Sequence, residues 1–86
     1  MSFSLSGSII TQSGTDADLS GLSGISGVTT VAQGAASKPY NVYSIGDRRL
    51  TINGTLNHDP AIEQLVVGDG ISGASILVNS GTYNYG

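Results

Sequence analysis

Short β-type runs that end at glycine or asparagine fill the last third of the chain and constrain its fold most. These runs cover residues 50–56, 62–67 and 75–83, and each is rich in β-branched or long aliphatic side chains. None of them carries the apolar stripe at helical spacing that an amphipathic helix needs. A fourth run, residues 41–45, alternates polar and apolar residues like a half-buried strand. The sequence therefore predicts an all-β protein of short strands and tight turns.

Two segments that lie far apart in the chain are nearly the same. Residues 8–15 (SIITQSGT) and 75–82 (SILVNSGT) share five of eight residues, and a similar cadence returns in TINGTL at residues 51–56. Each copy is a β run, then an amide or hydroxyl side chain, glycine and threonine. A solenoid repeats strand, turn and strand in every coil, so glycine and asparagine return at its corners. We therefore expect a short right-handed parallel β-helix or β-solenoid, with a small β-sandwich of hairpins as the alternative.

The length of 86 residues predicts one domain that spans residues 1–86. A chain of this size buries a modest share of its surface, and without cysteine it cannot be stabilised by disulfides. A small solenoid also exposes strand edges and coil ends. We therefore expect the protein to be oligomeric, and the chain is also compatible with the N-terminal part of a longer protein.

The segment 19–31 carries apolar residues at a strict spacing of three, with Ser-Gly or Thr-Thr between them. This spacing fits an extended three-fold chain or short 3₁₀ turns, and it suits a wrap that lays one apolar row on a neighbouring surface. If that neighbour is another subunit, the row forms an interface. The candidate interface residues are Leu19, Leu22, Ile25, Val28 and Val31.

Charge argues against nucleic acid as a partner, and hydropathy argues against a membrane. The chain has six acidic and three basic residues, whereas a nucleic-acid-binding surface needs a basic stripe. No stretch approaches the roughly 18 apolar residues that a membrane-spanning helix requires. The first residues carry no basic segment followed by an apolar one, so no signal peptide is predicted. We expect neither nucleic acid nor membrane as a partner.

Motifs that could carry chemistry have simpler structural interpretations. The segment 68–73 matches the G-x-G-x-x-G pattern of dinucleotide sites, but a strand is predicted after it where such sites need a helix. Asp16 and Asp18 could share a strand face and bind calcium, although aspartates also cap turns. His58, the single histidine, lies beside Asp59 in a turn where converging partners are not expected. The sequence predicts no enzyme activity, no catalytic residues, no cofactor and no metal.

Tyr83 and Tyr85 are two residues apart, so they share one face of the last predicted strand. They could stack across coils, close an end of the structure, or contact sugars. Sugar contact by these tyrosines and nearby asparagines defines an alternative function, a glycan-binding adhesin module. A third candidate is a fragment of a polysaccharide-processing β-helix enzyme, which would need converging acids that the sequence does not show.

Three segments together resemble a known class of proteins. They are residues 16–22 (DADLSGL), 49–56 (RLTINGTL) and 58–65 (HDPAIEQL). Their cadence is similar to the opening, the N-terminal β-helix segment, of virion appendage proteins from marine and other tailed phages, which include tail fibres and spikes. The similarity extends over most of the chain and lies in the pattern of strand and turn residues.

The resemblance implies a structural protein, a subunit of a phage tail fibre or related appendage. Such proteins usually form trimers, so the implied partner is the protein itself, with other virion proteins as further partners. It also implies synthesis in the host cytoplasm and a final location in the virion. Proteins of this class are typically much longer than this chain, which fits an N-terminal part.

Overall fold

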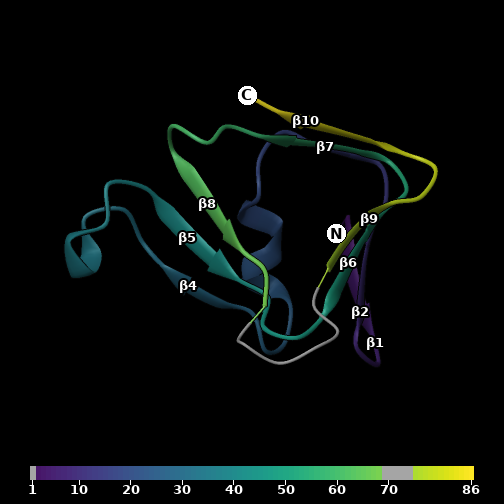
Figure 1. Cartoon of the computed structure of the whole chain (residues 1–86), viewed down its shortest axis with the longest axis horizontal. Helices are drawn as coiled ribbons and strands as arrows, with labels where there is room; N and C mark the ends of the chain where they lie inside the picture. Colours follow the sequence, from purple (N-terminus) through teal and green to yellow (C-terminus); the bar gives the residue numbers. More distant parts are fainter. Residues whose placement is uncertain (1, 69–74) are drawn as a thin grey trace.

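The computed structural model describes residues 2–68 and 75–86, and these contain strands and two short 3₁₀ turns but no α-helix (Figure 1). The elements in chain order are β1 (Phe3–Ser6), β2 (Ile9–Gln12), β3 (Thr15–Asp16), η1 (Ser20–Gly24), β4 (Thr29–Val31), η2 (Ala35–Ser37), β5 (Asn41–Ser44), β6 (Arg49–Ile52), β7 (Thr55–His58), β8 (Glu63–Val66), β9 (Ser75–Val78) and β10 (Thr82–Tyr85). The prediction of an all-β fold is confirmed.

The strands form three small sheets that outline a triangle (Figure 1). Sheet A has the order β1-β2-β6-β9, sheet B the order β10-β7-β3, and sheet C the order β4-β5-β8. From β2 onward the chain visits A, B and C in turn, so strands from successive passes lie side by side. These neighbours pair in parallel, whereas β1 on β2 and β4 on β5 pair antiparallel. The sheets are therefore mixed.

The repeated segments 8–15 and 75–82 occupy corresponding places in the stacked strands, but in sheet A their residues are offset by one position. In sheet A, Ile10 pairs with Leu50 and Leu50 with Ile76, whereas the sequence repeat had set Ile9 opposite Ile76. In sheet B the repeat holds, because Thr15 and Thr82 both pair with Thr55. The corner between β9 and β10 covers residues 79–81, one residue more than the corner at 53–54, and this insertion accounts for the shift.

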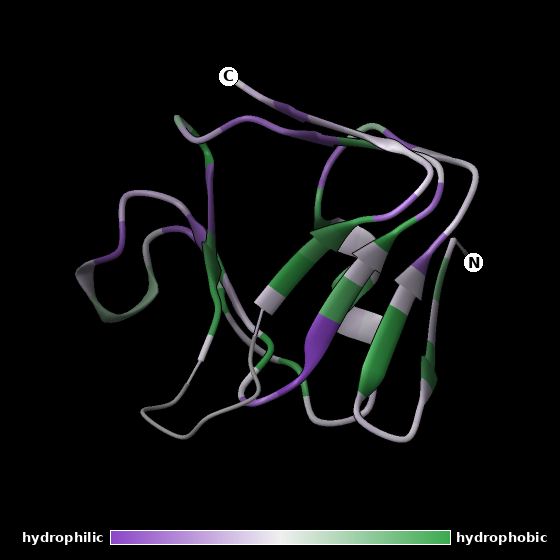
Figure 2. Cartoon of the chain, turned by 45° about the vertical axis from the view of Figure 1, so that its right-hand side comes forward, coloured by the Kyte–Doolittle hydropathy of each residue, from purple (hydrophilic) through white to green (hydrophobic). Residues whose placement is uncertain are grey.

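The interior of the triangle is filled by apolar side chains from all three sheets and from the segment around η1. Figure 2 shows hydrophobic stretches on the strands of sheet A and polar colours at the corners. The buried cluster consists of Phe3, Ile10, Leu19, Leu22, Ile25, Tyr43, Ile45, Leu50, Ile52 and Leu56. Full burial of one such aliphatic side chain stabilises the fold by roughly 1.5–3 kcal/mol, so this cluster is the main source of stability.

The apolar row at spacing three lies mostly inside its own chain. Leu19 and Leu22 are fully buried and Ile25 is 7% exposed, with η1 forming the short 3₁₀ turn that this spacing allowed. The prediction of an intersubunit interface is wrong for these three residues, because the surface that they cover is the interior of the same molecule. Val28 and Val31 are half-buried, and an interface role for them stays a prediction.

Candidate functional site at the open end of the sheets

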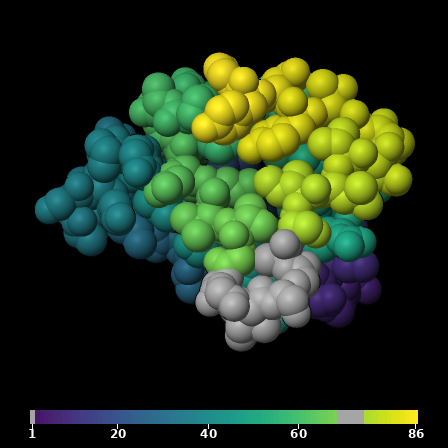
Figure 3. Space-filling model, in the orientation of Figure 1, coloured from purple at the N-terminus to yellow at the C-terminus, as the bar shows by residue number. Residues whose placement is uncertain are grey.

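The two ends of the stacked strands are finished differently. At the N-terminal end the outermost strands are β1, which lies antiparallel along β2, the two-residue β3, and β4, which lies antiparallel along β5. At the other end β8, β9 and β10 are the outermost strands of sheets C, A and B. An outermost strand leaves a row of backbone N–H and C=O groups unpaired. We call the surface formed by β8, β9 and β10 the open end, and it faces the viewer in Figure 3.

Side chains that face the interior are left uncovered at the open end. Leu50 and Ile52 in β6 are fully buried. Their partners in β9 are Ile76 and Val78, which remain 37% and 45% exposed. The apolar character and the register are maintained, so the difference arises because none of the described strands lies beyond β9. The open end therefore exposes positions that are core positions one strand earlier.

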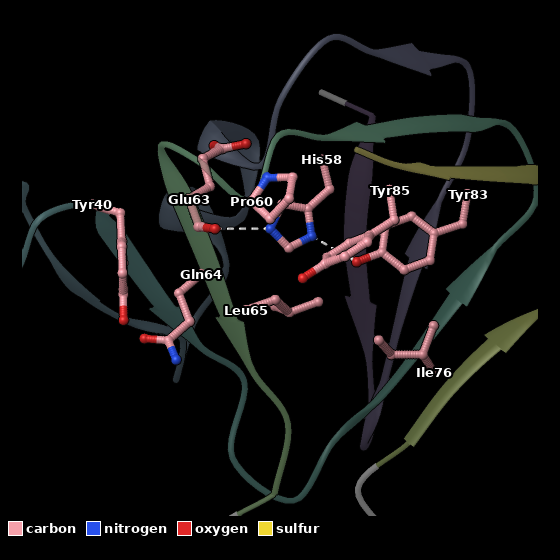
Figure 4. Close-up of a pocket in the computed structure, with 9 residues that line it drawn as sticks. All are labelled: Tyr40, His58, Pro60, Glu63, Gln64, Leu65, Ile76, Tyr83 and Tyr85. Atoms are coloured by element: carbon pink, nitrogen blue, oxygen red, sulfur yellow. Dashed lines mark hydrogen bonds between the residues drawn. The ribbon is translucent and has the colours of Figure 1, made fainter.

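A cavity of about 320 Å³ opens between β8 and the pair β9 and β10 (Figure 4). Its wall combines aromatic, apolar and polar side chains. The lining residues are Tyr40, His58, Pro60, Glu63, Gln64, Leu65, Ile76, Tyr83 and Tyr85. Because Ile76 and Tyr83 are paired with the buried Leu50 and Leu56, the cavity is an uncovered part of the interior.

His58 lies at the back of this cavity and links the strands around it by hydrogen bonds. Its side chain is 4% exposed, and Nε2 lies 3.0 Å from the backbone oxygen of Glu63 while Nδ1 lies 2.7 Å from the Tyr83 hydroxyl. A carbonyl oxygen can only accept, so Nε2 carries the hydrogen and, in the neutral ring, Nδ1 accepts from Tyr83. Both ring nitrogens are thus engaged in bonds that join β7, β8 and β10. The predicted turn begins after His58, which is itself the last residue of β7.

The two tyrosines proposed from the sequence for sugar contact meet at this cavity. The Tyr85 ring packs edge-on against His58 with centroids 4.9 Å apart, and the Tyr83 and Tyr85 centroids are 6.2 Å apart. Burial raises the pKa of the Tyr83 hydroxyl, and the nearby Tyr85 and Glu63 raise it further. Tyr83 therefore stays protonated as the donor to His58. Tyr85 is 67% exposed, so much of its side chain is in contact with solvent.

Asparagines form two ladders on the outside of the stack. Nδ2 of Asn79 donates to Oδ1 of Asn53 over 3.0 Å, and Nδ2 of Asn84 donates to Oδ1 of Asn57 over 2.9 Å. Each amide therefore bonds to the strand or corner before it. Among the hydrogen bonds between described residues, none reaches Oδ1 of Asn79 or of Asn84. These two oxygens are the acceptors that each ladder presents at the open end.

Glycines stack at the corner between sheets A and B. A Cβ atom on Gly54 would overlap the backbone of Gly14, and one on Gly81 would overlap the carbonyl oxygen of Gly54. Neither Gly54 nor Gly81 has a positive φ. Glycine is required at positions 54 and 81 because each corner rests directly on the one before it, whereas at Gly14 the φ of +72° favours glycine.

Glu63 is a buried anchor that was not predicted from the sequence. It is 4% exposed, its Oε2 accepts a 2.9 Å hydrogen bond from the backbone N–H of Leu19, and its Oε1 has no partner. Burial raises the pKa of this carboxyl, the Leu19 N–H lowers it, and the charge of Asp18 raises it. Figure 4 shows the carboxyl directed away from Tyr83 and Tyr85. Glu63 thus ties β8 to the start of η1, and its only sequence signal was an acid within the β-type run 62–67.

The two aspartates considered for calcium are engaged separately. Asp18 accepts hydrogen bonds from the backbone and hydroxyl of Ser20, which hold its pKa below the ordinary value, whereas Asp16 accepts from Nε2 of Gln12. Within residues 2–68 and 75–86, no three His, Cys, Asp or Glu side chains are grouped as a metal site would require. Of the G-x-G-x-x-G segment, residues 69–73 lie outside the described residues.

Comparisons with known proteins give no information on the function of this chain. No protein-family model, curated protein or solved structure matches the chain. No helix in the described part is long and apolar enough to cross a membrane.

Proposed function

We propose that the protein is a structural module, a short right-handed parallel β-helix that assembles through its open end. The observation that carries this proposal is the exposure of Ile76 and Val78, whose register partners Leu50 and Ile52 are buried core residues. Exposed apolar positions on a free sheet edge favour strand addition by another polypeptide.

The β-helix proposal is supported by the order in which the chain visits the three sheets. A small sandwich of hairpins, the alternative, would pair consecutive strands antiparallel, as only β1 with β2 and β4 with β5 do here. The other pairs join strands of successive passes in parallel. Right-handedness is the strongly preferred sense of connections between parallel strands.

The proposed setting is a phage virion appendage, a tail fibre or related structure, to which segments 16–22, 49–56 and 58–65 are similar. The protein would be made in the host cytoplasm and act in the virion, as a homo-oligomer of three subunits in contact with other virion proteins. A structural rather than enzymatic role is supported by His58, since both of its ring nitrogens bond within the fold.

Sedimentation velocity of the purified chain tests assembly through the open end. We expect concentration-dependent association, to three times the 8.7 kDa of one chain for the proposed trimer. The double variant Ile76→Ser and Val78→Ser should remain monomeric. The matched control is Leu77→Ser, which alters an equally exposed residue (43%) on the other face of β9 and should still associate. A wild-type monomer at every concentration, or association that the double variant does not change, would overturn the proposal.

The cavity favours glycan binding as a second candidate function. Exposed aromatic faces beside amide and hydroxyl groups suit the apolar and polar sides of a sugar ring, and Tyr85, Tyr40 and Gln64 provide such groups. An array of glycans tests this candidate. Binding that disappears with Tyr85→Ala but persists with Tyr85→Phe would support it, and an array without any binding would count against it. Glu63 is the single carboxylate among the described lining residues and is held by Leu19, so the polysaccharide-processing candidate gains no support.

A further inference from the structure

We propose that the open end accepts one further coil of extended polypeptide in parallel register, and that it selects a coil with glycine at the corner and asparagine at the two ladder positions. This inference rests on the proposed assembly function and names its partner chemistry. The partner is an extended segment of the kind that forms β9 and β10. In the proposed homo-oligomer it is the exchanged segment 75–85 of a neighbouring subunit, and not that subunit's folded surface.

The backbone of β9 and β10 has its free groups aligned for such an addition. The N–H groups of Asn79, Thr82 and Gly86 donate to the preceding pass, to the backbone oxygens of Ile52, Gly54 and His58 at 3.0, 2.8 and 3.1 Å. Alternate residues of a strand direct their N–H and C=O groups to opposite edges. Val78, Tyr83 and Tyr85 therefore direct theirs to the free edge, continuous across the two strands.

The glycine corner determines which side chain can follow. Gly81 rests on Gly54 and Gly54 rests on Gly14 so closely that a Cβ at either upper position would overlap backbone atoms below it. A coil added with the same stacking meets the backbone of Gly81 in the same way. Its corner residue must therefore also be glycine, and any larger residue would lift the corner off the stack.

The asparagine ladders add a polar requirement. Asn79 and Asn84 each donate to the asparagine of the preceding pass, at Asn53 and Asn57. The same geometry repeated once more places an amide donor of the added coil against Oδ1 of Asn79 and of Asn84. The segment 75–85 of this chain has all of these features, since it carries apolar residues, both asparagines and the corner glycine.

A folded second copy does not meet these requirements. A copy stacked head to tail would set its antiparallel edge strands β1 and β4 against β9 and β8, and would not continue the stack in parallel register. Two open ends brought together by a two-fold axis would oppose β9 to β9 in antiparallel orientation, which does not place a glycine corner over Gly81. The structure thus favours an extended coil.

A synthetic peptide with the sequence of residues 75–85 provides the probe, added to the isotope-labelled chain of residues 1–86. We expect saturable binding, slower amide exchange at Val78, Tyr83 and Tyr85, and dissociation of any oligomer formed through the open end. A peptide with Gly81→Val should bind at least about tenfold more weakly, as should one with both asparagines replaced by leucine. Placing the substitutions in the peptide leaves the folding of the protein unaffected.

The outcomes separate this inference from the function on which it rests. Equal binding of the original and the Gly81→Val peptides, or protection of amides elsewhere, would overturn the coil selection. If no peptide binds while the chain still associates and Ile76→Ser with Val78→Ser abolishes that association, the inference fails and the assembly function stands. If neither peptide binding nor association occurs, both fail.

Discussion

The hydroxyl of Tyr83 donates a 2.7 Å hydrogen bond to Nδ1 of His58, and so joins the side chains of β10 and β7, two strands already paired in parallel. The other nitrogen of the ring bonds to the backbone of Glu63 in β8. One imidazole therefore links sheets B and C at the open end. This link keeps the outermost strands in place although no further strand covers them.

Removal of the Tyr83 hydroxyl should weaken this link. In Tyr83→Phe, Nδ1 of the buried His58 loses its partner, and a buried unsatisfied acceptor costs roughly 1–3 kcal/mol. We expect the free energy of unfolding in urea to fall by about 1–2 kcal/mol. In the control Tyr85→Phe the lost hydroxyl has no hydrogen bond to a described residue, so a change within about 0.5 kcal/mol is expected. Equal losses in the two variants would show that the bond is not a stabilising link.

Glu63 should make stability depend on pH. Its pKa is raised on folding, chiefly by burial, so the folded protein holds this proton more tightly than the unfolded chain. The stabilising contribution is complete below the ordinary pKa of 4.5 and is lost as the pH rises through the raised value. Asp18, with a lowered pKa, has the opposite dependence and loses its contribution only at more acidic pH.

The variant Glu63→Gln tests this dependence, because the amide oxygen can still accept from Leu19 and the side chain stays neutral. From pH 4.5 to mildly alkaline pH, the unfolding free energy of wild type should fall relative to the variant. The difference should reach about 1 kcal/mol, the scale of one unsatisfied buried acceptor. Taking the difference between the two proteins removes the titrations that they share. Parallel curves over this range would contradict the prediction.

The corner glycine should be more sensitive than a glycine that needs only its unusual φ. Gly54→Ala forces a methyl group against the Gly14 backbone, an overpacking that costs typically 1–3 kcal/mol or more. Gly46 has a φ of +65° but open space around its Cβ position, so Gly46→Ala should cost about 1–2 kcal/mol from backbone strain alone. Thermal unfolding followed by circular dichroism should rank Gly54→Ala as the less stable. The reverse ranking would mean that the corners are not in close contact.

Leu22 should behave as a core residue of the single molecule. Leu22→Ala opens a cavity in a fully buried site, and such changes cost about 2–5 kcal/mol. Ser26→Ala, an exposed change in the same glycine-rich segment, should leave stability within about 0.5 kcal/mol. Denaturant unfolding measures both. A Leu22→Ala protein with unchanged stability but a changed oligomeric state would restore the interface interpretation of this residue.

Local sequence pattern determined which segments are strands and where they turn. The β-branched runs became β6 to β10, and the repeated Gly-Thr pairs became stacked corners. Residues 41–44 became the predicted strand β5, although its neighbours Val42 and Tyr43 are both buried and do not alternate. These features depend on neighbours along the chain, through steric preference and the space available at a corner. A single sequence therefore contains enough information to predict them.

Long-range packing decided how the interior and the open end are formed. The apolar row from Leu19 to Ile25 became interior because side chains of the three sheets pack against it, and the spacing alone could not say which surface it would cover. The one-residue shift that sets Ile10, and not Ile9, in line with Ile76 depended on the extra residue in the corner 79–81, and its effect shows only when β9 is paired with β6. The buried carboxyl of Glu63 and the cavity beside Tyr83 depend on side chains from several sheets. Such contacts arise only when the passes stack, because each joins residues whose separation along the sequence leaves no local trace.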